Sequence, residues 1–512
     1  MSGVLDRLGL VPVVVLAAIT RLPGLASRGR FDADQGHDML VLLGMTQGAW
    51  PLLGPRTSVG EFHHGAFYYY LLSPAAFVSG ADPVAVTAWL ALFGIAAVAL
   101  TWWLARSIAG PLAGRVAGLL LAVSPAAIEQ STFIWNPNPI PLFAALALGA
   151  AWQGHTTGRW GWWTIAIGAA TAVGQLHVLG SVFLVGIVAI VGAEARGAGG
   201  DAGAATARRA ESWRGAAGGL ALAVLLFLPL ILHELQTGFL ETRRVLDYVA
   251  AGGAGAEGGL VTALAFTLLR VVGWPLVGLV TDVPALAAVA VGVVVALGGW
   301  LVVVARGERR TAALWLVGLL AWSVVALSVT ASSLQRVVAG LPNDHYHAFA
   351  DPAVAVLVAL AAVTLIERLR RPGVALVTVG LALLGAVAAS RWPPARDPDG
   401  GWEAAQDAGV RIATAAGGGT VVLVGLPDFK LADGIGFPIL PAGAGLVPIE
   451  SPTDAIVVAC DRLFEGAIGA PCGGLAEDLA VRDLVPGGAD LPYDISRFAA
   501  SPRTEISIYT PR

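Results

Sequence analysis

The stretch PVAVTAWLALFGIAAVALTWWLAR, residues 83–106, decides the fold class. Residues 83–105 carry no charged side chain, and a helix that spans a bilayer needs about 20 mostly apolar residues. The whole chain has the same character, because its 512 residues are 56% hydrophobic and 13% charged, whereas a soluble domain carries about 25% charged residues. We therefore predict an all-α polytopic membrane protein. The formal net charge of -4 gives no reason to expect a nucleic-acid partner.

About eleven transmembrane helices are expected. Lys and Arg collect in cytoplasmic loops, and the Arg-rich stretches, 306–310 and 367–371 among them, become cytoplasmic together if there are eleven spans with the N-terminus inside and the C-terminus outside. The first apolar run lacks a small-residue cleavage site, so it is interpreted as a retained span. The spans are placed near 9–25, 83–105, 112–128, 139–155, 160–176, 178–194, 216–233, 284–305, 311–330, 352–367 and 373–390.

The apolar segment 260–280 does not fit this count. It is long enough to cross the membrane, but an extra span there would move the Arg-rich stretch 306–310 to the outside. Arg270 at its centre would cost about 2.5–3.5 kcal/mol on insertion scales, and Trp274-Pro275 interrupts the helix. We interpret it as a helix at the outer interface, with a twelfth span as the alternative.

The composition changes after Arg391, which divides the chain into a membrane domain (1–390) and a C-terminal domain (391–512). Residues 403–416 have helical spacing, and TVVLVGL, DAIVVAC and TEISIYT are typical of short strands. A small extracytoplasmic α/β domain is expected. A disulfide between Cys460 and Cys472 is then favoured, because that compartment is oxidising; two free thiols are the alternative.

The first outer loop, residues 26–82, contains the acidic stretch RFDADQGHDML at 30–40. Histidines gather on the same side, since only His155 is placed in the cytoplasm. Charges near lipid are costly unless they are hydrated or paired, so the pattern indicates a cavity lined by outer loops. The residues in question are Asp32, Asp34, His37, Asp38, Glu61, His63, His64, His177, His233, His345 and His347.

Several of these stretches share an order with a known family. Besides the acidic loop, they are GAFYYYLL at 65–72, SPAAIEQSTFIWNPNPIPLF at 124–143 and DHYHAFADPAVAVL at 344–357. Together they resemble the GT-C superfamily of integral-membrane glycosyltransferases, in particular the branch of protein mannosyltransferases and lipid A aminoarabinose transferases. The resemblance covers about residues 1–390 and is best at 30–143.

The resemblance implies that the chain is a hexosyl- or pentosyltransferase. Its donor would be a polyprenyl-phosphate-linked sugar in the outer leaflet, and its acceptor a hydroxyl group of a glycan, lipid or protein. The family's acidic pair corresponds here to Asp34-Gln35, preceded by Asp32, which departs from Asp-Glu or Asp-Asp. A composition rich in Gly, Ala, Val and Arg with a single lysine, Lys430, suggests a bacterial plasma-membrane enzyme of the cell envelope.

The chemistry needs a base and a cation. An acceptor hydroxyl is a poor nucleophile, and a positioned carboxylate accelerates its attack by about 10²–10⁴-fold. We predict Asp34 as this base with Asp32 as a second catalytic acid; the alternative is a solvated loop acid or a helix N-cap. A divalent cation bound by Asp32, Asp34 or His37 is left open. The candidate phosphate holders are Arg56, Arg243, Arg244, Arg270 and Arg336, with Arg270 preferred.

Further substrate contacts are expected from the outer loops. Each has a structural alternative: the histidines could cap loops, the tyrosines could anchor the interface, and the asparagines could stabilise a turn. The complete set of predicted substrate-binding residues is Asp38, Arg56, His63, His64, Tyr69, Glu129, Asn136, Asn138, Arg270, His345 and Tyr346.

Two other functions compete with glycosyl transfer. A transporter or flippase for a lipid-linked substrate would show internal repeats and charged residues at mid-membrane, whereas the ionisable residues here gather in outer loops. A non-catalytic scaffold that presents the C-terminal domain would not need an acidic cluster in the first loop.

Overall fold

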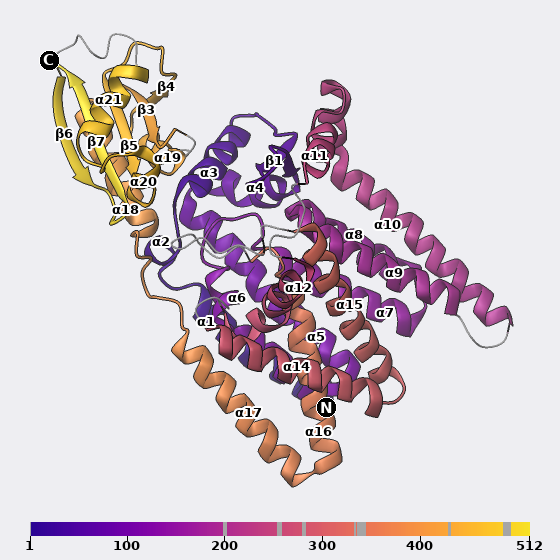
Figure 1. The fold of residues 1–512 in the computed structure, drawn as a ribbon. Helices are drawn as coiled ribbons and strands as arrows, with labels where there is room; N and C mark the ends of the chain where they lie inside the picture. The colour runs from indigo at the N-terminus through magenta and orange to yellow at the C-terminus, as the bar shows by residue number, and fades with distance from the viewer. Residues whose placement is uncertain are drawn as a thin grey trace.

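The structure is a computed structural model that describes residues 2–197, 202–252, 259–278, 283–331, 334, 345–428, 432–484 and 493–512. A helical bundle accounts for the chain up to residue 390, and a domain with a five-stranded sheet follows it. The predicted fold class, a largely helical membrane protein with a small C-terminal α/β domain, is confirmed. Figure 1 shows the sheet domain beside α3 at one end of the bundle.

The long helices of the bundle coincide with the predicted spans. Among the described residues, eight helical stretches are long and apolar enough to cross a membrane, so the count of eleven is not confirmed. The long helices of the bundle, including some that do not meet this criterion, are α1 (Ser2–Arg21), α5 (Pro83–Val123), α7 (Ile140–Thr157), α8 (Trp160–Leu176), α9 (Ser181–Gly197), α10 (Ala202–Thr237), α14 (Pro284–Val304), α15 (Glu308–Thr330), α16 (Ala350–Leu369) and α17 (Arg371–Ser390).

Helix α5 covers two predicted spans in one element. Its backbone leaves helical geometry at Ala109 and at Gly110, where φ is +84°, and Pro111 follows. A left-handed glycine directly before a proline breaks the helical hydrogen-bond ladder. The two halves are therefore separate rods joined by a sharp kink, as the sequence analysis expected from its two spans.

The two Arg-rich stretches meet at one end of the bundle. Arg309 forms an ion pair with Glu367, and Arg368 donates to the carbonyl of Val304 at 2.7 Å. The α16–α17 connection lies at the opposite end from α3 in Figure 1. The arginine-rich turns and the acidic loop thus occupy opposite ends of the bundle.

The segment that did not fit the predicted count of spans, 260–277, consists of α12 (Leu260–Leu268), a π-helical turn (Leu269–Gly273) and α13 (Trp274–Val277). It contacts α14, α15 and α16, and Arg270 in its middle is 1% exposed. By length and composition the segment qualifies as a span. The expectation of a helix lying on the outer interface is therefore not supported, because the central turn is packed inside the bundle.

Several short elements shape the end of the bundle that carries the acidic loop. Helix α3 and the hairpin β1–β2 belong to the first loop, and α11 covers the hairpin side. Their bounds are α2 (Leu25–Arg28), α3 (Ala33–Thr46), β1 (Leu53–Arg56), β2 (His63–Gly65), α4 (Phe67–Ser79), α6 (Pro125–Glu129), the 3-10 turn Val178–Gly180 and α11 (Leu240–Ala250).

The C-terminal domain is a mixed sheet in the order β4-β3-β5-β7-β6. Strands β3, β4 and β5 are parallel, whereas β7 runs antiparallel to both β5 and β6. The predicted strands coincide with β3, β5 and β7. The elements are α18 (Gly401–Ala415), β3 (Thr420–Leu426), α19 (Asp433–Ile439), β4 (Gly445–Val447), β5 (Ala455–Asp461), a 3-10 turn (Arg462–Phe464), α20 (Glu465–Ile468), α21 (Leu475–Leu484), β6 (Tyr493–Ala499) and β7 (Thr504–Pro511).

Strand β5 is buried along its whole length. Alternate residues face two cores, because Val457 packs with Ile412 and Ile435 of α18 and α19, while Val458 packs with Val481 of α21. A strand covered on both faces has a continuous apolar sequence, which explains why AIVVA lacks the alternation of a half-buried strand.

Candidate active site

The N-terminal turn of α3 carries the acidic stretch. The Asp32 carboxylate accepts from the backbone N–H of Asp34 at 3.2 Å, and the Gln35 side chain accepts from the backbone N–H of Asp32 at 3.0 Å. This reciprocal capping box fixes where the helix begins. Asp32 is therefore the helix cap, whereas Asp34 lies in the first turn with an exposed side chain.

One turn further, Asp38 is buried at 3% exposure. The hydroxyls of Tyr68 and Tyr69 donate to its two carboxylate oxygens, each at 2.9 Å. Burial raises the pKa of Asp38 to about 7, with the two hydrogen bonds acting in the opposite direction. Two residues predicted to bind substrate, Asp38 and Tyr69, thus bind each other and join α3 to α4.

The segment between α6 and α7 lies against α3. Gln35 Nε2 donates to the carbonyl of Ile134 at 2.8 Å. The two predicted asparagines stabilise this segment, since Asn136 Nδ2 donates to Leu176 O at 2.6 Å and Asn138 Nδ2 to Phe133 O at 2.7 Å. Both are more than nine-tenths buried. In the structure, these two asparagines stabilise a turn, which was the alternative to substrate binding.

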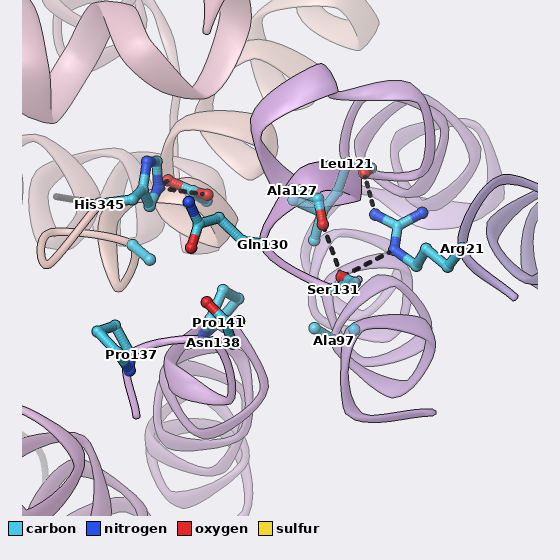
Figure 2. Close-up of a pocket in the computed structure, with 13 residues that line it drawn as sticks. Arg21, Ala97, Leu121, Ala127, Gln130, Ser131, Pro137, Asn138, Pro141 and His345 are labelled. Carbon is cyan, nitrogen blue, oxygen red and sulfur yellow. Dashed lines mark hydrogen bonds and ion pairs between the residues drawn. The ribbon is translucent and has the colours of Figure 1, made fainter. Parts of the chain in front are cut away.

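The late histidine loop meets the same segment. The Tyr346 ring lies 5.3 Å from Trp135, and His345 lines a pocket with Gln130, Asn138 and Arg21 (Figure 2). His345 Nε2 is 3.0 Å from both carboxylate oxygens of Asp351, and both side chains are 1% exposed. The Asp351 carboxylate therefore favours the tautomer with the proton on Nε2, in which Nδ1 is the acceptor nitrogen of the neutral ring.

Three loops far apart in the sequence thus converge: the start of α3, the segment 130–139 and the turn 345–351. Solved structures have a similar overall fold. The undecaprenyl-phosphate-bound crystal structure of ArnT from Cupriavidus metallidurans matches with a TM-score of 0.61 at 14% identity, over 97% of both chains. Its apo form gives 0.57 at 12% identity over 97% of both chains. The chain therefore has an ArnT-like fold.

Two further comparisons agree with this. Residues 58–194 match the family model of dolichyl-phosphate-mannose-protein mannosyltransferases. The apo oligosaccharyltransferase of Archaeoglobus fulgidus gives a TM-score of 0.50 at 12% identity, over 96% of this chain and 73% of that one. A search of curated protein sequences finds no significant match. The GT-C resemblance inferred from the sequence is confirmed.

In this ArnT-like fold, Arg270 lies close to the late histidine loop. Its guanidinium carbon is 5.3 Å from the Phe266 ring centre and 5.5 Å from that of Trp274. Trp274 in turn packs 5.1 Å from His345. Arg270 is therefore connected to His345 through Trp274 and does not itself line the pocket of Figure 2. The other predicted phosphate holders lie elsewhere. Arg56 forms an ion pair with Glu61 at 3.1 Å on the surface, Arg243 is exposed, and Arg244 forms an ion pair with Glu241. Arg336 is outside the described residues.

Glu129 is the last residue of α6 and lies close to Arg30 and His345. Burial raises the pKa of Glu129, whereas electrostatic interactions with nearby Arg30 and His345 lower it. Arg30 also stacks over Phe133, with its guanidinium carbon 5.6 Å from the ring centre. Glu129 was predicted from the sequence, but Arg30 and Asp351 were not. The sequence offered only their closeness along the chain to Asp32 and His345 as an indication of a role.

The two neighbouring histidines of strand β2 point to different sites. His63 Nδ1 lies 3.1 Å from the Glu241 carboxylate of α11. His64 packs 4.5 Å from His177, whose ring stacks on Tyr346 at 4.1 Å. Burial lowers the pKa of His64 to about 3, so this imidazole is neutral. Only His64 therefore adjoins the convergent loops, and His63 is a structural contact to α11.

The C-terminal domain contacts the acidic helix directly. His37 Nδ1 is 2.8 Å from Asp433 Oδ2 of α19, which raises the pKa of His37. A Cβ on Gly36 would lie 2.1 Å from Asp433 O, and one on Gly434 would lie 2.6 Å from the Asp32 carbonyl carbon. Glycine at both positions allows this close approach. No pattern in the sequence paired residues 36–37 with 433–434.

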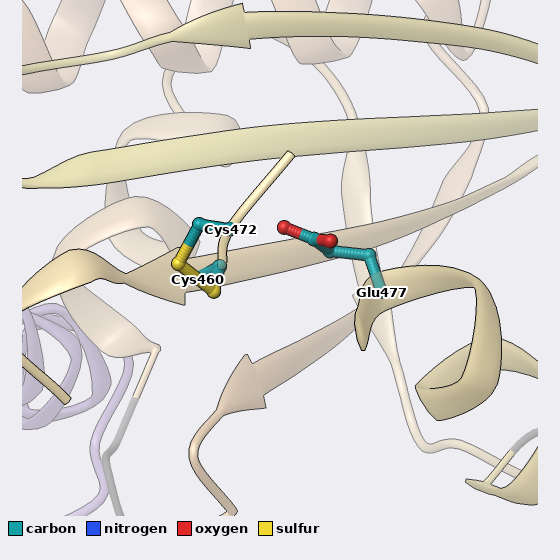
Figure 3. A group of neighbouring side chains, drawn as sticks. All are labelled: Cys460, Cys472 and Glu477. Atoms are coloured by element: carbon teal, nitrogen blue, oxygen red, sulfur yellow. A yellow bond between two sulfur atoms is a disulfide. The ribbon is translucent and has the colours of Figure 1, made fainter. Parts of the chain in front are cut away.

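A metal site is not formed by the predicted residues. Among the described residues, the single group of three or more side chains with converging ligand atoms is Cys460, Cys472 and Glu477 (Figure 3). The two cysteines are joined in the expected disulfide, with Sγ–Sγ 2.04 Å, so neither supplies a thiolate. Glu477 instead accepts from the backbone N–H groups of Gly473 and Gly474. Asp32, Asp34 and His37 are not such a group.

Proposed function

We propose that this protein transfers a sugar from a polyprenyl-phosphate donor to a hydroxyl acceptor on the outer face of a bacterial plasma membrane. The observation that carries the proposal is the convergence of the α3 start, the segment 130–139 and the turn 345–351 in an ArnT-like fold. The Gln35–Ile134 hydrogen bond and the Trp135–Tyr346 contact join the three. A crystal structure of ArnT bound to undecaprenyl phosphate supports the class of donor.

Asp34 is the proposed base. Its carboxylate takes the proton of the acceptor hydroxyl while the oxygen attacks the anomeric carbon and the bond from that carbon to the phosphate oxygen breaks. Polyprenyl phosphate leaves with the bonding electrons, so it needs charge stabilisation rather than a proton. Such a displacement inverts the anomeric centre. Asp32 supports the base as the cap of its helix, since its carboxylate is already bonded to the N–H of Asp34.

Arg270 and His345 are the proposed holders of the leaving phosphate. Both pack against Trp274, with the Arg270 guanidinium carbon 5.5 Å and the His345 ring 5.1 Å from its ring centre. Asp351 fixes the orientation of His345 through contacts of 3.0 Å. A guanidinium and an oriented imidazole, buried where the dielectric constant is low, interact more strongly with a phosphate than exposed cations do.

Donor turnover tests the proposal. Purified protein in liposomes is incubated with radiolabelled mannosyl, glucosyl or arabinosyl polyprenyl phosphate and an envelope extract that supplies acceptors. We expect one donor to be consumed, His345→Ala to slow its consumption, and His155→Ala on the opposite side of the bundle to leave it unchanged. Absence of turnover with every donor would contradict the proposal, and movement of intact donor across the bilayer would favour a flippase.

The orientation can be tested by cysteine labelling. Both native cysteines are in the disulfide, so a single added cysteine reports its own position. Asp407→Cys on exposed α18 should react with an impermeant maleimide in intact cells, and Arg310→Cys should react only after lysis. The reverse pattern would place the acidic helix in the cytoplasm and would overturn the outer-face mechanism.

A further inference from the structure

The C-terminal domain has the topology of a ligand-binding α/β sheet. From β3 the chain passes to β4 on one side of β3 and then to β5 on the other side. In open α/β sheets, ligands bind outside the carboxyl ends of the strands where the strand order reverses. This rule points to the crevice beyond Leu426 and Asp461, the last residues of β3 and β5.

A pocket lies at that crevice, and the membrane domain forms its other wall. Leu426, Cys460 and Asp461 line it from the sheet, and Phe31 and Asp32 line it from the loop that leads into α3. The close glycine contacts between α3 and α19 hold the two walls together. The pocket therefore adjoins the start of α3, since Asp32 and Ala33 line it and Asp34, the proposed base, is the next residue in the chain.

The charges of the pocket select against anions. Among the described residues that line it, the carboxylates are Asp32, Asp399 and Asp461, and the one guanidinium is Arg503. Arg503 donates from Nε at 2.8 Å and from Nη2 at 2.6 Å to Asp461, so these two charges neutralise each other. Asp32 and Asp399 leave a net negative wall, which repels phosphate and accepts hydrogen bonds from hydroxyl groups.

An aromatic side chain completes the wall. The Phe31 ring lies 4.9 Å from Trp402 and 6.3 Å from Phe437, both in the C-terminal domain. Phe31 thus presents a fixed apolar surface next to carboxylates. Apolar C–H faces and hydroxyl donors occur together on a sugar ring. A divalent cation fits less well, because these carboxylates are not a convergent group among the described residues.

We propose that this interdomain pocket binds a neutral sugar residue of the acceptor glycan and presents it to Asp34. This inference rests on the proposed glycosyl transfer for its role, but binding of the sugar does not depend on the donor. The C-terminal domain then selects the acceptor, and the membrane domain holds the donor. Asp399 accepts from a sugar hydroxyl, and Asp32 caps α3 while it faces the same ligand.

Ligand-observed NMR tests binding directly. Full-length protein in nanodiscs is titrated with methyl mannoside, methyl glucoside and methyl galactoside, with inorganic phosphate as the anionic comparison. We expect saturation transfer to at least one glycoside and none to phosphate. Asp399→Asn should weaken the binding about tenfold, because it removes one charged hydrogen-bond acceptor. Asp407→Asn, at an exposed position of α18 outside the pocket, should bind like wild type.

A second variant guards against a folding defect. Ala404→Leu adds volume to the pocket without a change of charge, and it should abolish the glycoside signal while thermal unfolding stays like that of wild type. Equal binding by Asp399→Asn and Asp407→Asn, no binding by wild type, or preference for phosphate would each overturn the proposal. A protein that binds glycosides but consumes no polyprenyl-phosphate sugar would contradict the proposed function and leave the sugar site standing.

Discussion

The first and second turns of α3 are neighbouring regions with opposite environments. Asp34 in the first turn is exposed beside the C-terminal domain, whereas Asp38 in the second is buried between two tyrosine hydroxyls. The two carboxylates belong to one motif and are one helical turn apart. Their surroundings separate a side chain that can meet a substrate from one that anchors the helix.

The difference shows that neighbouring polar residues of one cluster have different roles in the structure. Asp32 caps the helix, His37 binds Asp433 of α19, and Asp38 binds α4. These contacts fix α3 from three directions. A base works best when its position is fixed by other groups, so most of the cluster is interpreted as support for Asp34.

The largest effect is expected for Asp34→Asn. The amide cannot take a proton, so transfer should fall by about 10²–10⁴-fold. The side chain is exposed, so thermal unfolding should stay within error of wild type. Radiolabelled donor turnover and unfolding, measured on one preparation, check both. Transfer at the wild-type rate would remove Asp34 from the mechanism.

Gly36→Ala should break the contact that positions the first turn. The new Cβ would meet the Asp433 carbonyl oxygen at 2.1 Å, so α3 and α19 must separate. A displacement of about 1 Å can slow catalysis by about 10²-fold. The matched control is Gly466→Ala, since a Cβ there meets nothing within 4 Å. If both variants turned over donor equally, docking of the C-terminal domain would be irrelevant to the reaction.

Asp38→Asn should act on stability and its pH dependence. The folded-state pKa of Asp38 is about 7 against a usual 3.8, so the folded protein binds a proton that the unfolded chain has lost between these values. Stability should therefore fall as pH rises from about 4 to about 7. The variant should lack this part of the slope, which unfolding temperatures at several pH values measure. Parallel curves for the two proteins would show that Asp38 ionises freely.

The smallest effect is expected for Tyr68→Phe. The change removes one hydrogen bond to the Asp38 carboxylate, and such a bond contributes about 1.5–3 kcal/mol. Chemical denaturation should show this loss, while donor turnover per folded molecule stays unchanged. Tyr70→Phe is the control, because its hydroxyl donates to the Pro51 carbonyl and not to Asp38. Equal losses in the two variants would argue against a special role for the Asp38 cluster.

Much of the architecture could be predicted from the sequence. The length of the apolar segments predicted most of the long helices, and continuous apolar runs predicted β3 and β5. Both are local features, because a segment buried in lipid or in a sheet core must itself be rich in apolar residues. The order of the acidic loop, the WNPNP turn and the late histidine loop also indicated the GT-C fold. The exception was 260–277, where the packing of Arg270 beside two aromatic rings cannot be inferred from hydropathy.

The site was less predictable residue by residue. Asp32, Asp34 and Asp38 have the same chemistry in the sequence, and nothing local distinguishes a cap, an exposed acid and a buried anchor. His63 and His64 were treated as a pair, but alternate residues of a strand point to opposite sides. Their partners, Glu241 and His177, lie more than a hundred residues away.

The sequence by itself determined that this is a membrane protein, where most of its long apolar helices lie, and which polar residues stand at one end of the bundle. These follow from transfer free energies, which each segment carries independently of the others. Only the tertiary structure decided which acid is exposed, that His345 is oriented by Asp351, and that α19 of the C-terminal domain packs against α3. Those facts depend on contacts between distant segments, and a contact energy exists only once the chain has brought both partners together.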